Sequence, residues 1–121
     1  MRRDLDLIRA LLAQFEGLPL DGAINARDAV VEPWTTDQIV YHCFLMHESM
    51  LIHAIDASTM GRRNILVLSL TSAGHDYLDA VRSDTIWKKV KSQAAAQGLS
   101  FTLDLAMATA VAYAKQLLKL P

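Results

Sequence analysis

Side chains that could bind a metal ion or act as nucleophiles gather in one part of the chain, at His42, Cys43, His47 and His53. Zinc sites usually combine such ligands with a C-x-x-C pair, and this chain has a single cysteine. Nucleophilic catalysis needs a serine or cysteine beside a base that a third group orients, and no such spacing is evident. We therefore expect no metal, no cofactor and no catalytic residue, and a protein that is not an enzyme.

Basic side chains that could contact phosphate groups form three pairs along the sequence. Contacts from Lys and Arg to phosphates supply most of the sequence-independent affinity for DNA. The whole chain has 12 Lys and Arg against 13 Asp and Glu, and this balance argues against a purely electrostatic grip on DNA. We expect any DNA contact to centre on Arg62 and Arg63, with Arg2, Arg3, Lys88 and Lys89 as additions.

The segment 35–70 must position Arg62 and Arg63, and it is predicted to form a helix followed by a hairpin. Thr35 and Gln38 have the spacing of a capping box, which begins a helix. The helix is predicted over Asp37 to Ser49, because Ile39, Cys43 and Met46 share one face, which places the Cys43 thiol in the core. Two apolar strands follow, Met50–Ile55 and Ile65–Leu68, joined by the turn Ser58–Asn64.

The outer face of the predicted helix carries Val40, Tyr41, Phe44 and Leu45. Apart from Gln38 at its edge, this face has no Arg, Lys, Asn or Gln, the side chains that read guanine and adenine edges. An apolar and aromatic surface suits a protein partner better. If the helix phase is shifted by one residue, Phe44 belongs to the core instead.

Further helices are predicted on both sides of this segment. Leu5, Ile8, Leu12 and Phe15 indicate an amphipathic helix over 3–16 that ends at a left-handed Gly17. Between 20 and 33 a strand at Ala29–Val31 is slightly favoured over a helix at 25–31. A helix from Thr71 or Ser72 should break near Ser83–Asp84 and end at Gly98. His42 and His75 are expected to form hydrogen bonds across the junction between the helix 37–49 and the helix that begins near 71.

The last predicted helix, Phe101–Leu120, is apolar on more than one side, and its apolar run of about ten residues is too short to span a bilayer. The rest of a small chain can cover only part of such a helix, so we expect a second copy to cover the remainder. The predicted dimer residues are Leu103, Met107, Ala110, Val111, Ala114 and Leu117.

These elements predict a mainly α protein with a small β-hairpin, of the α+β class. The expected architecture is a winged helix-turn-helix followed by C-terminal helices. The predicted division is a winged-helix-like domain at 1–98 and a C-terminal apolar helix at 99–121, packed on the same unit as the dimerisation element. The first residues have no apolar signal core, and together with the single cysteine this predicts a cytoplasmic protein without membrane association.

Several segments resemble the bacterial and phage family called domain of unknown function 2513. They are Arg2–Arg9, Leu70–Lys89, Tyr41-His42, Leu51-Ile52 and Ala54–Asp56. The resemblance implies a winged-helix-like fold and occurrence in phages or prophages, and it brings no active site. It also marks one departure, because such proteins usually have a glycine at the position of Met50 before Leu51.

We expect a non-enzymatic homodimer that acts as a DNA-associated transcriptional regulator of phage or prophage type. The alternative is a protein-interaction module that binds or inhibits a host or phage protein through the apolar face of the helix 36–48. Fold-level analogy favours the first function and the composition of that face favours the second.

Overall fold

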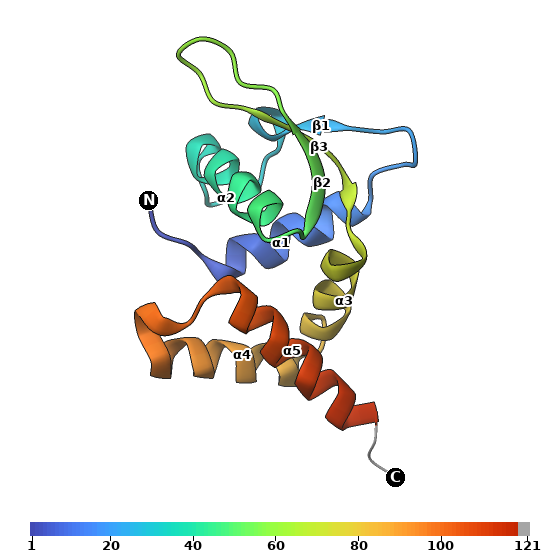
Figure 1. Cartoon of the computed structure of the whole chain (residues 1–121), viewed down its shortest axis with the longest axis vertical. Coiled ribbons are helices and arrows are strands. Elements are labelled where there is room, and N and C mark those ends of the chain that lie inside the picture. Colours follow the sequence, from blue (N-terminus) through green and yellow to red (C-terminus); the bar gives the residue numbers. More distant parts are fainter. Residues whose placement is uncertain (119–121) are drawn as a thin grey trace. The chain divides into compact units, whose positions relative to one another are not determined.

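The computed structural model describes residues 1–118, in which five α-helices and a three-stranded antiparallel sheet are present (Figure 1). This mainly helical α+β architecture confirms the predicted fold class. The chain divides into two compact units, and the second begins at Asp76. The boundary suggested by the sequence after Gly98 therefore falls inside the second unit.

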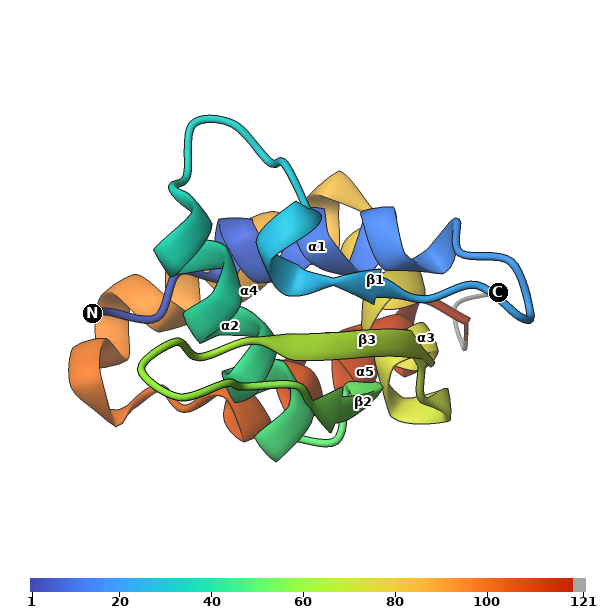
Figure 2. The ribbon, with the colours of Figure 1, turned by 90° about the horizontal axis from the view of Figure 1, so that it is seen from above.

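The first unit contains the sheet, in the order β1-β3-β2 (Figure 2). Strand β3 (Ile65–Leu70) pairs with β2 (Ile52–Asp56) on one side and with the short β1 (Ile24–Asn25) on the other. Ile65 and Val67 are buried while the residues after each of them are less so, which is the two-residue alternation of a half-buried strand. Both strands of the predicted hairpin are confirmed, but the first begins at Ile52 rather than at Met50.

Helix α1 (Leu5–Glu16) packs against β3 and begins two residues after Arg3. It starts at Leu5 rather than at Arg3, because the Asp4 carboxylate caps it by accepting hydrogen bonds from the backbone of Asp6 and Leu7. Its buried side chains are Leu7, Ile8, Leu11, Leu12 and Phe15.

Helix α2 (Thr36–Glu48) begins with the predicted capping box, which the hydrogen bonds between Thr35 and Gln38 confirm. Its C-terminus is unusual, because Met50 adopts a left-handed conformation with φ of 62°. Two backbone bonds close the turn, from Leu51 to the Met46 carbonyl at 2.9 Å and from Met50 to the His47 carbonyl at 3.1 Å. This is a Schellman motif with methionine where glycine is preferred.

Two predictions for the segment after α1 were wrong. Ala29–Val31 forms no strand, and Val30 is 74% exposed. The strand is β1, followed by a short 3-10 helix, η1 (Ala26–Asp28). Ile24 and Asn25 form the strand because they pair with Val67 and Leu66 of β3, and no hydrophobic pattern in the sequence marks them. Gly17 is also not left-handed, since its φ is −76°.

The second unit consists of most of α3 (Ser72–Val81), α4 (Asp84–Gln97), a short 3-10 helix, η2 (Gly98–Ser100), and α5 (Leu103–Leu118). Ser83 caps α4 through the backbone of Ile86, which confirms the predicted break. Gly98 ends α4 with φ of 58°, as predicted. The predicted end of the last helix at Leu120 lies outside the described residues. No helix within residues 1–118 is both long and apolar enough to cross a bilayer.

Candidate docking surface on α2 and the hairpin

A hollow of about 180 Å³ opens on the first unit, beside the outer face of α2. Small-molecule sites usually measure roughly 300–1,000 Å³, so this hollow suits one or two side chains of a partner rather than a whole ligand. Residues from the N-terminal segment, η1, α2 and the hairpin line it: Met1, Arg27, Asp37, Val40, Tyr41, Phe44 and Arg63.

An arginine on an aromatic ring dominates this surface. The guanidinium carbon of Arg63 lies 4.0 Å from the centroid of the Phe44 ring, within the range of a cation–π interaction. The Arg63 guanidinium forms no hydrogen bond with any residue in the described part of the chain. Its N–H groups can therefore bind a carboxylate or phosphate that arrives at the hollow.

Arg27, which the sequence analysis did not single out, fixes the position of this cluster. Its Nε donates a 2.8 Å hydrogen bond to the Arg63 carbonyl oxygen, and its guanidinium lies 3.5 Å from Asp37 on α2. The base of the hairpin is also tied to the segment of Arg27, because Asn64 accepts from the Arg27 backbone and donates to Asn25. No local sequence signal marks Arg27, because its partners lie ten or more positions away.

The hairpin projects beyond the sheet (Figure 1), and Arg62 lies in its turn, opposite Thr59. Thr59 and Arg62 exchange two backbone hydrogen bonds around Met60 and Gly61, and Gly61 takes the positive φ of 79° that the turn requires. Met60 is fully exposed. Hydrogen bonds from the side chain and backbone of Ser58 hold the pKa of Asp56 below its usual range, which keeps a carboxylate at the foot of the turn.

The predicted docking residues on α2 differ in their accessibility. Tyr41 is 36% exposed, Phe44 and Leu45 are half-buried, and Val40 is only 4% exposed. Val40 therefore forms the floor of the hollow rather than an outer contact. Gln38 supplies its side-chain oxygen to the capping box, with a 2.8 Å hydrogen bond from the Thr35 backbone. The one amide side chain at the edge of this face is thus already engaged in holding the helix start.

The inner side of α2 is core, as the sequence predicts. Ile39, Cys43 and Met46 are each at most 1% exposed, and burial raises the pKa of the Cys43 thiol to about 12. A thiol with such a pKa is not a nucleophile at neutral pH. No group of three His, Cys, Asp or Glu side chains within residues 1–118 could hold a metal ion.

His42 is also buried, but its partners are not the predicted ones. Its Nε2 accepts a 2.8 Å hydrogen bond from the Asp4 backbone, and its Nδ1 lies 2.7 Å from the Gln38 carbonyl oxygen. It therefore ties the start of α1 to α2, whereas His75 is exposed. The same Asp4 accepts a 3.1 Å hydrogen bond from the indole of Trp34. Burial lowers the pKa of His42, and the hydrogen bond that Nε2 accepts from Asp4 requires the neutral form of the ring.

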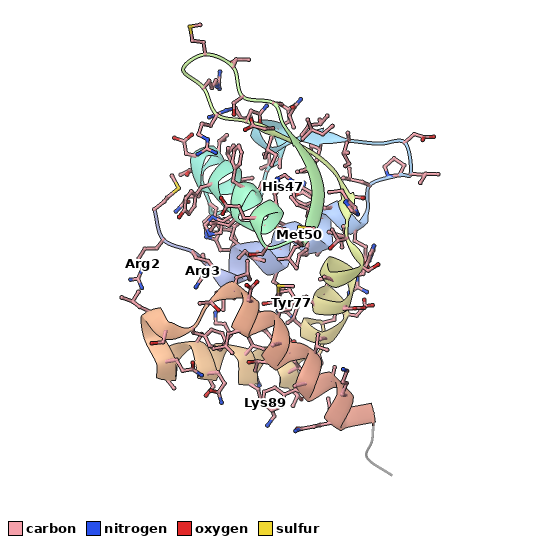
Figure 3. All side chains as sticks on the ribbon, in the orientation of Figure 1. Arg2, Arg3, His47, Met50, Tyr77 and Lys89 are labelled. Atoms are coloured by element: carbon pink, nitrogen blue, oxygen red, sulfur yellow. The ribbon has the colours of Figure 1, made fainter. Side chains whose placement is uncertain are left out.

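The other predicted basic contacts are distributed over both units. Arg2 and Arg3 lie on the extended segment before α1, and both are exposed (Figure 3). Lys88 and Lys89 lie on α4 in the second unit, where the Lys89 ammonium is 4.9 Å from the centroid of the Tyr113 ring. Arg62 and Arg63 are adjacent in sequence but act differently, since Arg63 folds onto Phe44.

The predicted dimer residues on α5 also divide into two groups. Leu103 and Ala110 are buried within the chain and cannot form an outer contact. Met107, Val111 and Ala114 are half-buried and Leu117 is 45% exposed, so these four remain accessible.

A family described as "Hypothetical protein (DUF2513)" matches residues 2–100 of the chain. The chain belongs to this family. An uncharacterized protein of Haemophilus influenzae is 32% identical to this chain over 108 residues, which cover 86% of this chain and 87% of the relative. No solved structure matches the chain.

The DUF2513 segment that begins at Leu70 has a structural role at its start. Thr71 caps α3 by accepting a hydrogen bond from the Gly74 backbone, and its own hydroxyl donates to the Met50 carbonyl. At Gly74 the helix passes so close to the Leu51 carbonyl oxygen that a Cβ atom would overlap it. These residues lock α3 against the turn between α2 and β2.

Proposed function

We propose that the first unit is a winged-helix binding domain that docks a protein segment on the outer face of α2. The order α1-β1-η1-α2-β2-β3 and the sheet order β1-β3-β2 support a winged helix, with η1 as a shortened second helix and β2–β3 as the wing. In such a domain α2 is the helix that meets the partner.

The observation that carries the proposal is the character of this helix face. It offers Tyr41 and Phe44 with Arg63 over the ring, and aromatic and arginine side chains are the commonest energetic anchors of protein interfaces. It also carries the carboxylates of Asp37 and Glu48, which repel phosphates. Gln38 is held in the capping box, and α2 has no Arg, Lys or Asn, so the helix itself offers no side chain that is free to read a base edge.

The partner's chemistry follows from the same residues. An apolar side chain fits the hollow, and a carboxylate beside it pairs with the Arg63 guanidinium. We therefore propose a segment with a leucine or aromatic side chain next to an acidic residue, from a host or phage protein. The docked protein is regulated or inhibited by this contact, and no chemistry is required of the domain.

The neighbouring arginines provide a matched test of this function. Arg63→Ala and Tyr41→Ser should abolish capture of the partner, because loss of a central aromatic or arginine anchor costs on the order of 2 kcal/mol or more. Arg62→Ala removes the same charge without touching Phe44, so its capture should be unchanged. A photo-crosslinking residue at Tyr41 should join the partner, whereas one at the exposed Leu20 should not.

DNA-associated transcriptional regulation is the second candidate, and the exposed hairpin tip favours it. Arg62 and Arg63 suit contacts with the phosphate backbone or minor groove. If DNA is the partner, replacing both arginines with alanine should lower the salt slope of binding by about 2, near one per lost phosphate contact. Nuclease treatment separates the two functions, since it removes DNA-mediated capture and spares direct protein contact. Capture that survives Arg63→Ala and Tyr41→Ser would refute docking on α2.

A further inference from the structure

A larger groove lies in the second unit, and none of the residues proposed for docking on α2 lines it. It measures about 500 Å³, within the usual range for a binding site, and its floor is apolar, formed chiefly by Ile86, Val111 and Leu117. Leu117 is 45% exposed, and Val111 is half-buried, so the groove leaves apolar surface accessible to water. Covering this surface releases free energy in proportion to the apolar area removed from water.

The two walls of the groove carry opposite charges. Helix α3 supplies the carboxylates of Asp76 and Asp79, and α5 supplies the ammonium group of Lys115. Asp76 and Lys115 are exposed, while Asp79 lies 3.2 Å from Arg82 on its own helix. The acidic wall is therefore represented best by Asp76, and the basic wall by Lys115.

We propose that the groove binds a second copy of this chain, related by a two-fold axis. In such an interface the same patch occurs on both copies, so the α5 wall of one copy meets the α3 wall of the other. Lys115 of each copy then pairs with Asp76 and Asp79 of its partner, and Val111 and Leu117 of both copies meet between the two charged pairs. Because one wall of the groove is acidic and the other is basic, two copies related by a two-fold axis bring opposite charges together at both walls.

This proposal is independent of docking on α2, because its residues all lie in the second unit. It also changes the set of residues that the sequence predicted for the dimer interface. Leu103 and Ala110 are buried and contribute nothing, and α3, which the apolar pattern of α5 did not implicate, supplies half of the interface.

A charge exchange tests the pairing. Analytical ultracentrifugation of the full chain should show a dimer. Lys115→Glu places carboxylates on both walls and should raise the dimer dissociation constant at least about ten-fold, because like charges then meet at two symmetric positions. The double variant Asp76→Lys, Asp79→Lys should do the same with the opposite sign.

Mixing the two variants distinguishes a broken interface from a damaged fold. In the mixed dimer, the carboxylate introduced at position 115 of one copy meets the lysines introduced at positions 76 and 79 of the other. At the second, symmetric position the original Lys115 still meets the original Asp76 and Asp79. The mixed dimer should therefore form with nearly the original affinity. Lys88→Glu makes the same charge change on α4 outside the groove and should leave the dimer intact.

Three results would overturn the proposal: a monomeric unmodified chain, a dimer that Lys115→Glu does not weaken, or a mixture that fails to reassociate although both variants keep the circular dichroism of the original chain.

Discussion

Met50 sits at the C-terminus of α2 in a conformation that favours glycine, and we expect Met50→Gly to stabilise the protein. The φ of 62° at Met50 is required by the two backbone bonds of the Schellman motif, which join Leu51 to Met46 and Met50 to His47. Met46 and Leu51 are fully buried, so packing keeps the turn in place whatever residue occupies position 50. The left-handed strain at Met50 is thus carried by the folded state.

The size of the effect follows from two opposing terms. A left-handed conformation costs a non-glycine residue roughly 1–2 kcal/mol, and replacement with glycine removes that cost. Glycine gives the unfolded chain more freedom, which costs about 0.5–1 kcal/mol on folding. The Met50 side chain is 66% exposed, so its removal loses little packing. The net gain in the free energy of unfolding should lie between about 0 and 1.5 kcal/mol, with a middle value of about 0.75 kcal/mol.

Urea unfolding followed by far-ultraviolet circular dichroism measures this gain. Met50→Ala is the matched control, because it removes the same side chain and keeps the left-handed strain, so its free energy of unfolding should stay within about 0.5 kcal/mol of the original. The reasoning fails if Met50→Gly is no more stable than Met50→Ala.

Two further predictions concern buried contacts in the first unit. His42 accepts a hydrogen bond through an unprotonated Nε2, and burial lowers its pKa from 6.5, so the unfolded chain binds the proton more readily. The contribution of neutral His42 to the free energy of unfolding should be fully present above about pH 6.5 and should be lost as the pH falls below that value. In urea titrations between neutral and mildly acidic pH, His42→Gln should therefore reduce the dependence of the free energy of unfolding on pH. Gly74→Ala places a Cβ atom against the Leu51 carbonyl oxygen and should destabilise the protein by about 2 kcal/mol or more in the same urea assay.

Each of these has a clear contrary outcome. If His42→Gln leaves the dependence of the free energy of unfolding on pH unchanged, other titratable groups cause the loss of stability in acid. Helix propensity alone would make Gly74→Ala more stable by up to about 1 kcal/mol, because alanine favours a helix more than glycine does. A Gly74→Ala variant that is as stable as the original chain, or more stable, would therefore show that the close approach to Leu51 does not decide the effect.

Much of the local structure was predictable because it depends on neighbouring residues. The capping box at Thr35 and Gln38, the hairpin strands, the break before Asp84 and the end of α4 at Gly98 all follow from spacings of a few positions. The core face of α2 was also predictable, since a 3.6-residue period assigns Ile39, Cys43 and Met46 to one side.

The candidate site was only partly predictable. The sequence selected Tyr41, Phe44 and Arg63, but it gave no reason to join Arg63 to Phe44, and it treated Arg62 and Arg63 as equivalent. It also missed Arg27, and it placed Val40 on the outer face although Val40 is buried. Side chains at the border of a helix face are assigned by what packs against them, which helical periodicity does not contain.

The sequence by itself therefore determined the helices, the hairpin and the class of the fold, because these are set by periodicity and by caps within a few residues. Tertiary structure decided the position of β1, the bond from Asp4 to His42 and the closeness of Gly74 to Leu51. It also forced Met50 into a left-handed conformation that no local preference favours. In each case the contact is with a residue that is remote in sequence or that lies across a packed turn. The free energy of that tertiary contact exceeds the local conformational preference that opposes it.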